Sequence, residues 1–172
     1  MKKSRMILAL ILVLLLLSLL FGCSAQAGYE GMLTEFFTSD KDGRFTDYKA
    51  GMLLLLQDDI NTQPLRYEAL SEKYHSGVGA YMTAEGVAAL RTGGGLVDFD
   101  NKADNLRCTV ALKSAAVTDA GNGKYTFTAV CTVTRADGNV TEGTEAGWFT
   151  TSGGKVSEIG FDDQAFEGVF GQ

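Results

Sequence analysis

The stretch TFTAVCTVTRADGNVT, residues 126–141, decides the fold class predicted for this chain. Every second residue from Phe127 to Val133 is apolar or small, and these residues alternate with Thr126, Thr128, Thr132 and Thr134, which is the period of a strand with one buried face. The Asp137-Gly138 pair that follows favours a tight hairpin turn. A second strand is expected to run from Val140 to Thr150. The stretch therefore predicts two long antiparallel strands joined by a hairpin.

The same period of two continues on both sides of this hairpin. Residues 106–113 alternate before it, and Gly153-Gly154 turns the chain after it into a further strand over residues 156–161. The prediction is a four-stranded antiparallel meander. Residues 96–99 allow a short fifth strand.

The register of the meander predicts which side chains face its concave side. With a two-residue turn at 137–138, Phe127 would lie opposite Trp148, and both would face inward with Cys131. If the preceding hairpin turns near Asn122, Cys108 would lie opposite residue 134 or 135, which is three or four positions from Cys131. This separation favours two buried thiols over a disulfide, although an exported protein permits either. A one-residue error would turn a whole strand over.

The N-terminal half of the chain has a helical period. A first helix is predicted by the apolar stripe Tyr29, Met32, Leu33, Phe36 and Phe37. A second is expected from Phe45 to Asn61, and its four consecutive leucines at 53–56 predict that it is covered on more than one side. Residues 65–74 predict a third, and Thr83 is expected to cap a fourth. Helices followed by a run of strands predict an α+β fold in which helices cover one face of a curved sheet.

This order resembles the NTF2-like (SnoaL-like) cone fold. The segment that follows Tyr74 looks like the helix that precedes the long strands in such domains: Tyr81-Met82-Thr83-Ala84-Glu85-Gly86-Val87-Ala88-Ala89-Leu90. The resemblance covers about residues 29–162 and implies an N-terminal helical group packed into a curved antiparallel sheet around a pocket. The fold hosts enzymes, ligand binders and interaction modules, so it does not decide the function.

The N-terminus has the pattern of an export signal, with basic residues before the apolar run of residues 6–20. Leu20-Phe21-Gly22-Cys23 resembles the cleavage box of bacterial lipoproteins, although Phe21 departs from the small residue usual there. The resemblance implies a signal peptide at 1–22, lipidation of Cys23, a tether at 23–28 and one domain over 29–172. It implies a lipid-anchored protein at the extracytoplasmic face of the cell membrane.

An uncleaved membrane anchor is the alternative. A spanning helix needs about 20 apolar residues, and residues 6–22 supply 17. Both the lipoprotein and the membrane-anchor interpretation leave the basic N-terminus in the cytoplasm and the rest of the chain outside. Removal of the signal takes away three basic residues and no acidic one, so the net charge changes from −6 to −9. This charge disfavours nucleic acid and anionic lipid headgroups as partners.

No set of residues with catalytic or metal-binding spacing stands out. His75 is the only histidine, and it has no partners at the spacing of a zinc site. It precedes a glycine break, where an exposed side chain is expected. No Gly-x-Ser-x-Gly motif is present. We therefore expect neither a metal nor a cofactor, and we predict no catalytic residue.

The candidate ligand-binding residues are Trp148, Tyr81, Tyr48 and Glu142. Trp148 would be a pocket wall or an ordinary core residue, and Glu142 an acid at the pocket mouth or a solvated carboxylate. The expected function is binding of a small apolar ligand or of an envelope protein, with a homodimer among the expected partners besides the bilayer that holds Cys23.

Two alternatives compete with this expectation. One is a SnoaL-like enzyme that uses Tyr48, Tyr81 and Glu142, and the other is an interaction module that pairs through a threonine-rich outer sheet face. An open apolar cone would favour the ligand binder. An enclosed pocket with two neighbouring polar side chains would favour the enzyme. A filled cone with an apolar patch outside it would favour the interaction module.

Overall fold

The computed structural model describes residues 28–59, 61–162 and 166–171. An N-terminal helix spans residues 28–36. It is followed by η1 (Lys41–Gly43), α2 (Arg44–Leu55), α3 (Gln63–Gly79), α4 (Ala84–Gly93), α5 (Gly95–Asn105), β1 (Cys108–Gly121), β2 (Lys124–Arg135), β3 (Val140–Ser152), β4 (Lys155–Phe161) and α6 (Glu167–Phe170). The signal peptide and Cys23 expected near the N-terminus lie outside the described residues. Within these residues, no helix is both long enough and apolar enough to cross a membrane.

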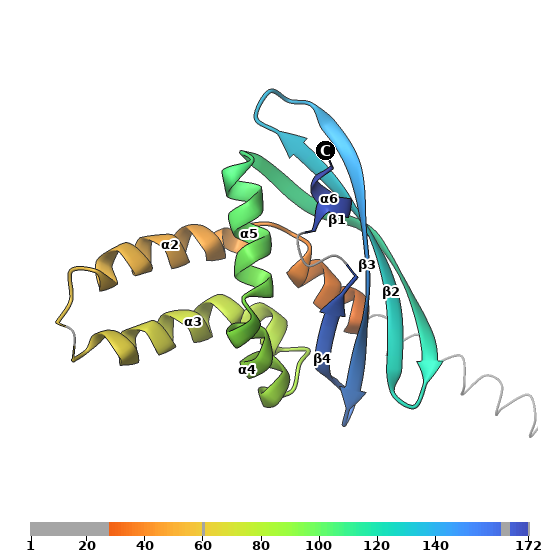
Figure 1. Cartoon of the computed structure of the whole chain (residues 1–172), viewed down its shortest axis with the longest axis horizontal. Coiled ribbons are helices and arrows are strands. Elements are labelled where there is room, and N and C mark those ends of the chain that lie inside the picture. The colour runs from red at the N-terminus through yellow and green to blue at the C-terminus, as the bar shows by residue number, and fades with distance from the viewer. Residues whose placement is uncertain (1–27, 60, 163–165, 172) are drawn as a thin grey trace, which may run out of the picture.

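The four strands form one antiparallel sheet in the order β1-β2-β3-β4. The sheet curves, and the N-terminal helix, α4, α5 and α6 lie on its concave side (Figure 1). The N-terminal helix buries the apolar stripe predicted for it, including Met32, Leu33, Phe36 and Phe37. The predicted α+β class, with helices packed on a curved antiparallel sheet, is confirmed.

The fifth strand considered at residues 96–99 is wrong, because these residues lie inside α5. Gly94 has a φ of 76° and ends α4 in the left-handed conformation that favours glycine. The next residue starts α5, in which Leu96, Phe99 and Ala103 recur at helical spacing and are buried. The glycine triplet thus joins two helices and does not lead into a strand.

The hairpin between β2 and β3 differs from the prediction by one residue. Arg135 N donates to Asn139 O at 2.9 Å, so three residues form the turn, and Gly138 has a φ of 83°. A three-residue turn with glycine in the left-handed region is a common hairpin. Phe127 therefore lies opposite Gly147, and Trp148 lies opposite Thr126.

This shift turns β3 over, because side chains alternate between the two faces of a strand. Phe149 is fully buried on the concave face, while Trp148 lies partly exposed on the outer face. The predicted inward position of Trp148 is wrong for this reason. The turn at Gly153-Gly154 has two residues as predicted, but an irregularity between Thr150 and Thr151 shifts the pairing beyond it.

Helices α2 and α3 form a hairpin that projects from the rest of the molecule (Figure 1). They pack closely on each other, since a Cβ added at Gly51 would stand 2.6 Å from a Leu70 methyl carbon. Helix α2 ends at Leu55, earlier than predicted. Leu55 is buried, but Leu53, Leu54 and Leu56 are 64%, 62% and 78% exposed. The prediction that the leucines are covered on more than one side is wrong, because α3 packs on only one side of α2.

Phenylalanines fill the space between the helices and the concave face. Their ring centroids lie 4.7 to 6.4 Å apart in a continuous cluster: Phe36, Phe37, Phe99, Phe127, Phe149, Phe161, Phe166 and Phe170. Helix α6 closes this cluster against β3. A Cβ added at Gly143 would stand 2.0 Å from Val169 O, so the backbones touch there. The cone is therefore filled by the protein's own side chains.

Candidate functional site

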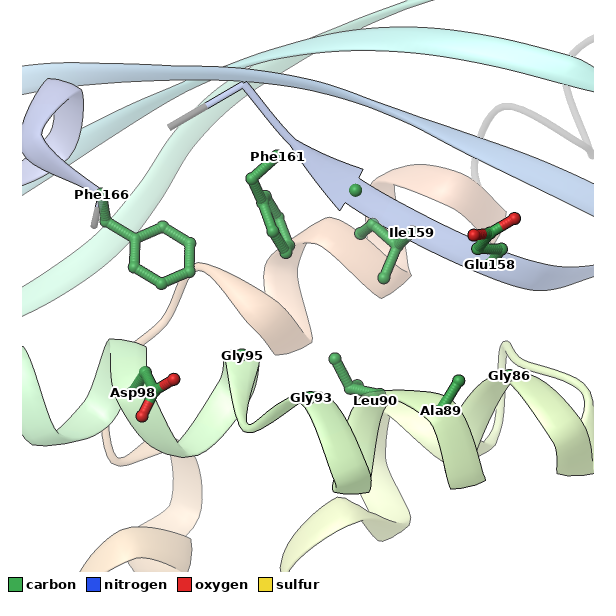
Figure 2. Close-up of a pocket in the computed structure, with 11 residues that line it drawn as sticks. Gly86, Ala89, Leu90, Gly93, Gly95, Asp98, Glu158, Ile159, Phe161 and Phe166 are labelled. Atoms are coloured by element: carbon green, nitrogen blue, oxygen red, sulfur yellow. The ribbon is translucent and has the colours of Figure 1, made fainter. Parts of the chain in front are cut away.

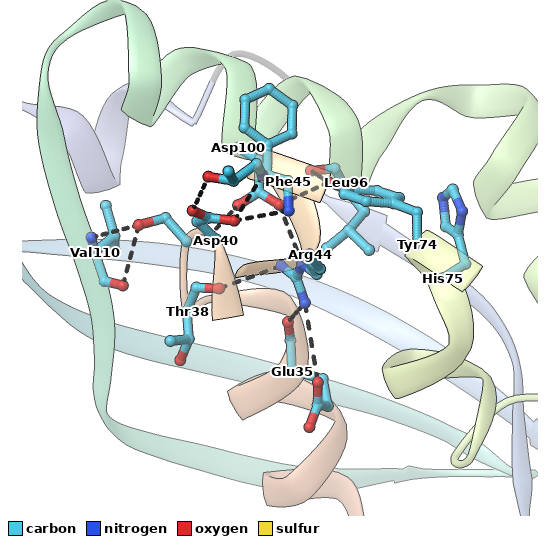
Figure 3. Close-up of polar contacts among 12 residues, drawn as sticks. Glu35, Thr38, Asp40, Arg44, Phe45, Tyr74, His75, Leu96, Asp100 and Val110 are labelled. Atoms are coloured by element: carbon cyan, nitrogen blue, oxygen red, sulfur yellow. Dashed lines mark hydrogen bonds and ion pairs between the residues drawn. The ribbon is translucent and has the colours of Figure 1, made fainter. Parts of the chain in front are cut away.

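A buried ion pair joins the start of α2 to α5 (Figure 3). Arg44 Nε donates to Asp100 Oδ2 at 3.1 Å, and the Tyr74 hydroxyl donates to the same oxygen at 2.6 Å. Asp100 Oδ1 accepts from Asp40 N at 2.9 Å. Burial raises the pKa of Tyr74, and the charge of Asp100 raises it further. The aspartate is thus fully occupied in joining three elements, which is a structural role.

His75 is buried in α3, contrary to the expected exposure. Its Nδ1 lies 2.8 Å from Ser71 O, so Nδ1 carries the proton and Nε2 is left as an acceptor. Nε2 has no hydrogen-bond partner among the described residues, and burial lowers the pKa of the imidazole. In the described ranges no three His, Cys, Asp or Glu residues are placed to hold a metal.

The structure does not bring the four candidate ligand-binding residues together. Tyr48 packs on Tyr74, with centroids 4.8 Å apart, and the Tyr81 ring covers Gly31 at the N-terminal helix. Trp148 and Glu142 lie on the outer face of β3, where the exposed Glu142 carboxylate pairs with Lys113. A ligand-binding role stays a prediction for each of them, and no shared site connects them.

The two described cysteines are free thiols. Cys108 lies opposite Arg135, as the register predicted, and Cys131 lies opposite Leu112. Burial raises the pKa of Cys131 to about 12, and the charge of Glu145 adds to this effect. A thiol this resistant to ionisation is a poor nucleophile.

Glu145 is the carboxylate that sequence reasoning missed. Its side chain is 2% exposed and points to the concave face of β3, opposite Ala129 and close to Gly168. The predicted register placed its neighbours Thr144 and Ala146 there instead. With a three-residue turn, the alternation Gly143, Glu145, Gly147 and Phe149 would have identified it.

A groove lies at the mouth of the cone, between α4–α5 and β4 (Figure 2). Its volume is about 410 Å³. Leu90 and Ala89 reach into it from α4, opposite Ile159 and Phe161 of β4, and the carboxylates Asp98 and Glu158 lie toward its two ends. Gly86 allows α4 to approach β4, since a Cβ there would stand 2.9 Å from Ser157 O. The groove can hold a small molecule with an apolar body.

Two further hollows lie outside the cone. A mainly apolar groove of about 370 Å³ runs along α2 and is lined by Phe45, Tyr48, Lys49, Met52, Leu53, Leu56 and Asn101. A hollow of about 290 Å³ lies on the outer sheet face beside Trp148. Neither was predicted, because both depend on which faces of α2 and β3 are left uncovered.

No family model and no curated protein matches this chain. Among solved structures it is similar to a proposed polyketide cyclase from Pseudomonas putida KT2440, with 13% identity and a TM-score of 0.37 over 60% of this chain and 91% of that one. It is also similar to an NTF2-like protein of unknown function from Burkholderia pseudomallei K96243, with 16% identity and a TM-score of 0.33 over 63% of this chain and 94% of that one. Likenesses at this level say nothing about what the present chain binds.

Proposed function

We propose that this protein is a lipid-anchored, extracytoplasmic interaction domain that docks a protein partner through the α2–α3 hairpin. The observation that carries the proposal is the leucine patch, defined as Leu53, Leu54, Leu56, Leu65 and Tyr67. A filled cone with an apolar patch outside it is the combination that favours an interaction module. The proposed location at the membrane rests on the resemblance of Leu20-Phe21-Gly22-Cys23 to a lipoprotein cleavage box.

The free energy available from covering the patch is substantial. Its four leucines are 62–78% exposed. Fully burying a leucine contributes about 1.5–3 kcal/mol, so covering these four would contribute roughly 4–8 kcal/mol. Association of two proteins costs roughly 4–15 kcal/mol. A partner must therefore present an apolar surface of its own, because a few scattered contacts would not offset the cost of association.

The groove along α2 indicates the form of that surface. Phe45, Met52, Leu53 and Leu56 line it at helical spacing over about three turns. Such a stripe can receive the apolar face of a partner helix, which would cover Leu53 and Leu56. The rest of the patch lies outside this groove and would need further contacts with the same partner. Lys49 lies at the edge of the groove beside Asp104, with Nζ 2.8 Å from Oδ1, and supplies the polar rim that interfaces have around an apolar centre.

A lipid bilayer is a less favourable partner for the leucine patch than a protein. Asp58 and Asp59 lie in the turn between α2 and α3, at the free end of the hairpin, and burying carboxylates in lipid is costly. Tyr29 packs on Tyr125 beside the β1–β2 turn, which lies on the opposite side of the molecule from the hairpin's free end (Figure 1). The first described residues of the chain, which would lead to the proposed anchor, and the α2–α3 hairpin thus lie on opposite sides of the molecule.

Photo-crosslinking in the native host tests the proposal. A photoreactive amino acid would replace Leu56 in the full chain, and Val140, a 57% exposed apolar residue outside the hairpin, is the matched control position. We expect a discrete protein adduct from position 56 that is absent from position 140 and lost when Leu53→Ser is added. Adducts with lipid alone, or equal adducts from both positions, would contradict the proposal.

The groove at the cone mouth favours a second function, binding of a small apolar molecule with a cationic group. The cation would lie at one end of the groove, beside Asp98 or Glu158, and Leu90 and Phe161 would face the apolar body. Native mass spectrometry of the full chain purified from its host would show a bound molecule. Ala89→Trp, which fills the groove, should remove it. Ala88→Trp, at the exposed neighbouring position, should not.

A further inference from the structure

We infer that the outer face of the sheet carries a saccharide-binding site centred on Trp148. This site is separate from the hairpin and from the groove at the cone mouth. It lies where β1, β2 and β3 run side by side and where none of the described helices covers the sheet (Figure 1).

Small residues create the hollow beside the indole ring. Ala116 of β1 and Ala146 of β3 line it, so the sheet surface is low there, and Trp148 stands next to them as a wall. The hollow has a volume of about 290 Å³, which is at the small end of ligand sites. One or two sugar rings are the size of ligand that such a space takes.

The position of the ring is set by Gly160, its cross-strand partner on β4. A Cβ at Gly160 would stand 2.7 Å from Trp148 Cε2, so the ring rests directly against the strand. Lys124 Nζ lies 4.9 Å from the ring centroid. An exposed lysine is held weakly in such a contact, so a ligand can displace it and keep the ring as a platform.

Hydroxyl groups surround the ring. Thr126 lies directly opposite Trp148, Thr118 lies opposite Thr126 on the next strand, and Thr128 lies two positions along β2. In the part of the chain that the structure describes, none of these three hydroxyls has a protein hydrogen-bond partner. Asp162 lines the same hollow and adds a carboxylate acceptor.

A pyranose ring matches this arrangement. It offers an apolar C–H face to an aromatic ring and hydroxyl groups, both donors and acceptors, around its edge. A purely apolar ligand would leave the threonine hydroxyls and the Asp162 carboxylate without partners, which is unfavourable. A polyanion is disfavoured by the chain's net charge of −6. The mixed aromatic and hydroxyl surface therefore fits a neutral saccharide best.

Trp148 reports on its own site, because it is the only tryptophan of the chain. The experiment is a titration of the intrinsic fluorescence of the full chain in detergent with chitotetraose and, separately, with cellotetraose. We expect a saturable change in the emission with at least one of them at millimolar concentration or below.

Matched threonine variants locate the binding. Thr126→Val and Thr128→Val should each weaken it by about 2- to 10-fold, the loss expected for one hydrogen bond. Thr132→Val, on the same face of β2 but opposite Glu142, should leave it unchanged. No saturable change with either probe would overturn the assignment. Equal affinities in all three threonine variants would also overturn it. A blue shift of the Trp148 emission that grows with protein concentration in the absence of sugar would indicate that a second copy of the chain binds this face, and would likewise overturn it.

Discussion

Arg44 and Asp100 are 56 residues apart in the chain, yet Arg44 Nε lies 3.1 Å from Asp100 Oδ2, and the aspartate is 1% exposed. Arg44 also donates to Thr38 O at 3.2 Å and to Glu35 O. The pair thus ties the end of the N-terminal helix, the base of the α2–α3 hairpin and α5 together. It holds the projecting hairpin to the rest of the molecule.

Removing one member of this pair should destabilise the fold strongly. Asp100→Ala leaves the Arg44 guanidinium without its buried partner, and we expect the free energy of unfolding to fall by about 3–5 kcal/mol. Asp104→Ala is the control, because the Asp104–Lys49 pair is half exposed and should contribute about 0–1 kcal/mol. Urea unfolding measures both. Equal losses of unfolding free energy in the two variants would show that the buried pair contributes no more to stability than the exposed pair.

The stability of the fold should depend on pH through His75. Burial lowers the pKa of His75 in the folded state, whereas the unfolded chain has an ordinary histidine pKa of about 6.5. Below that pH the unfolded state binds a proton that the folded state resists, so stability falls as pH drops. His75→Gln should flatten the change in unfolding free energy between pH of about 7.5 and 5.5. An unchanged slope in the variant would rule out this origin.

Two glycines of α4 should respond oppositely to alanine. A Cβ at Gly86 would stand 2.9 Å from the Ser157 carbonyl oxygen of β4, whereas a Cβ at Gly93 meets nothing within 4 Å. Gly86→Ala should force α4 away from β4 and lower the thermal midpoint. Gly93→Ala should be neutral or stabilise by up to about 1 kcal/mol, since alanine favours helix. Stabilisation by both substitutions would mean that α4 moves without cost.

Adjacent leucines of the hairpin should differ in their effect on folding. Leu55 is buried, and Leu55→Ala should cost about 2–5 kcal/mol of unfolding free energy. Leu56 is exposed, and Leu56→Ala should change the free energy by no more than about 0.5 kcal/mol. Thermal unfolding of the two variants tests whether the exposed leucines contribute to the stability of the fold or are available for binding. A large loss at Leu56 would assign the patch to folding.

Cys131 should resist alkylation in the folded protein. Its pKa is raised to about 12, with burial as the main cause, so little thiolate is present near neutral pH. Iodoacetamide labelling followed by peptide mass analysis should show Cys131 modified only in denaturant. Fast labelling of the native protein, or a Cys108–Cys131 disulfide in the native protein, would contradict the observed burial and separation.

The amino-acid sequence by itself determined the class of each half of the chain. The helical stripe at Tyr29, Met32, Leu33 and Phe36 predicted a buried helix, and the alternation from Phe127 to Val133 predicted a strand with one buried face. Both are local properties, because the period of apolar residues follows directly from the geometry of helix and strand. The separation of Cys108 from Cys131 was predicted correctly because it depends on the β1–β2 hairpin alone.

Tertiary structure decided which faces are covered. The left-handed φ of Gly138 makes the β2–β3 turn one residue longer than its Asp-Gly pair suggested, and this residue places Trp148 outside and Glu145 inside. Leu53 to Leu56 look like a core segment in sequence, yet only Leu55 is buried, because α3 packs on only one side of α2. A sequence pattern records how apolar residues are spaced, whereas burial depends on what lies beside them, and that is set by contacts between residues far apart in the chain.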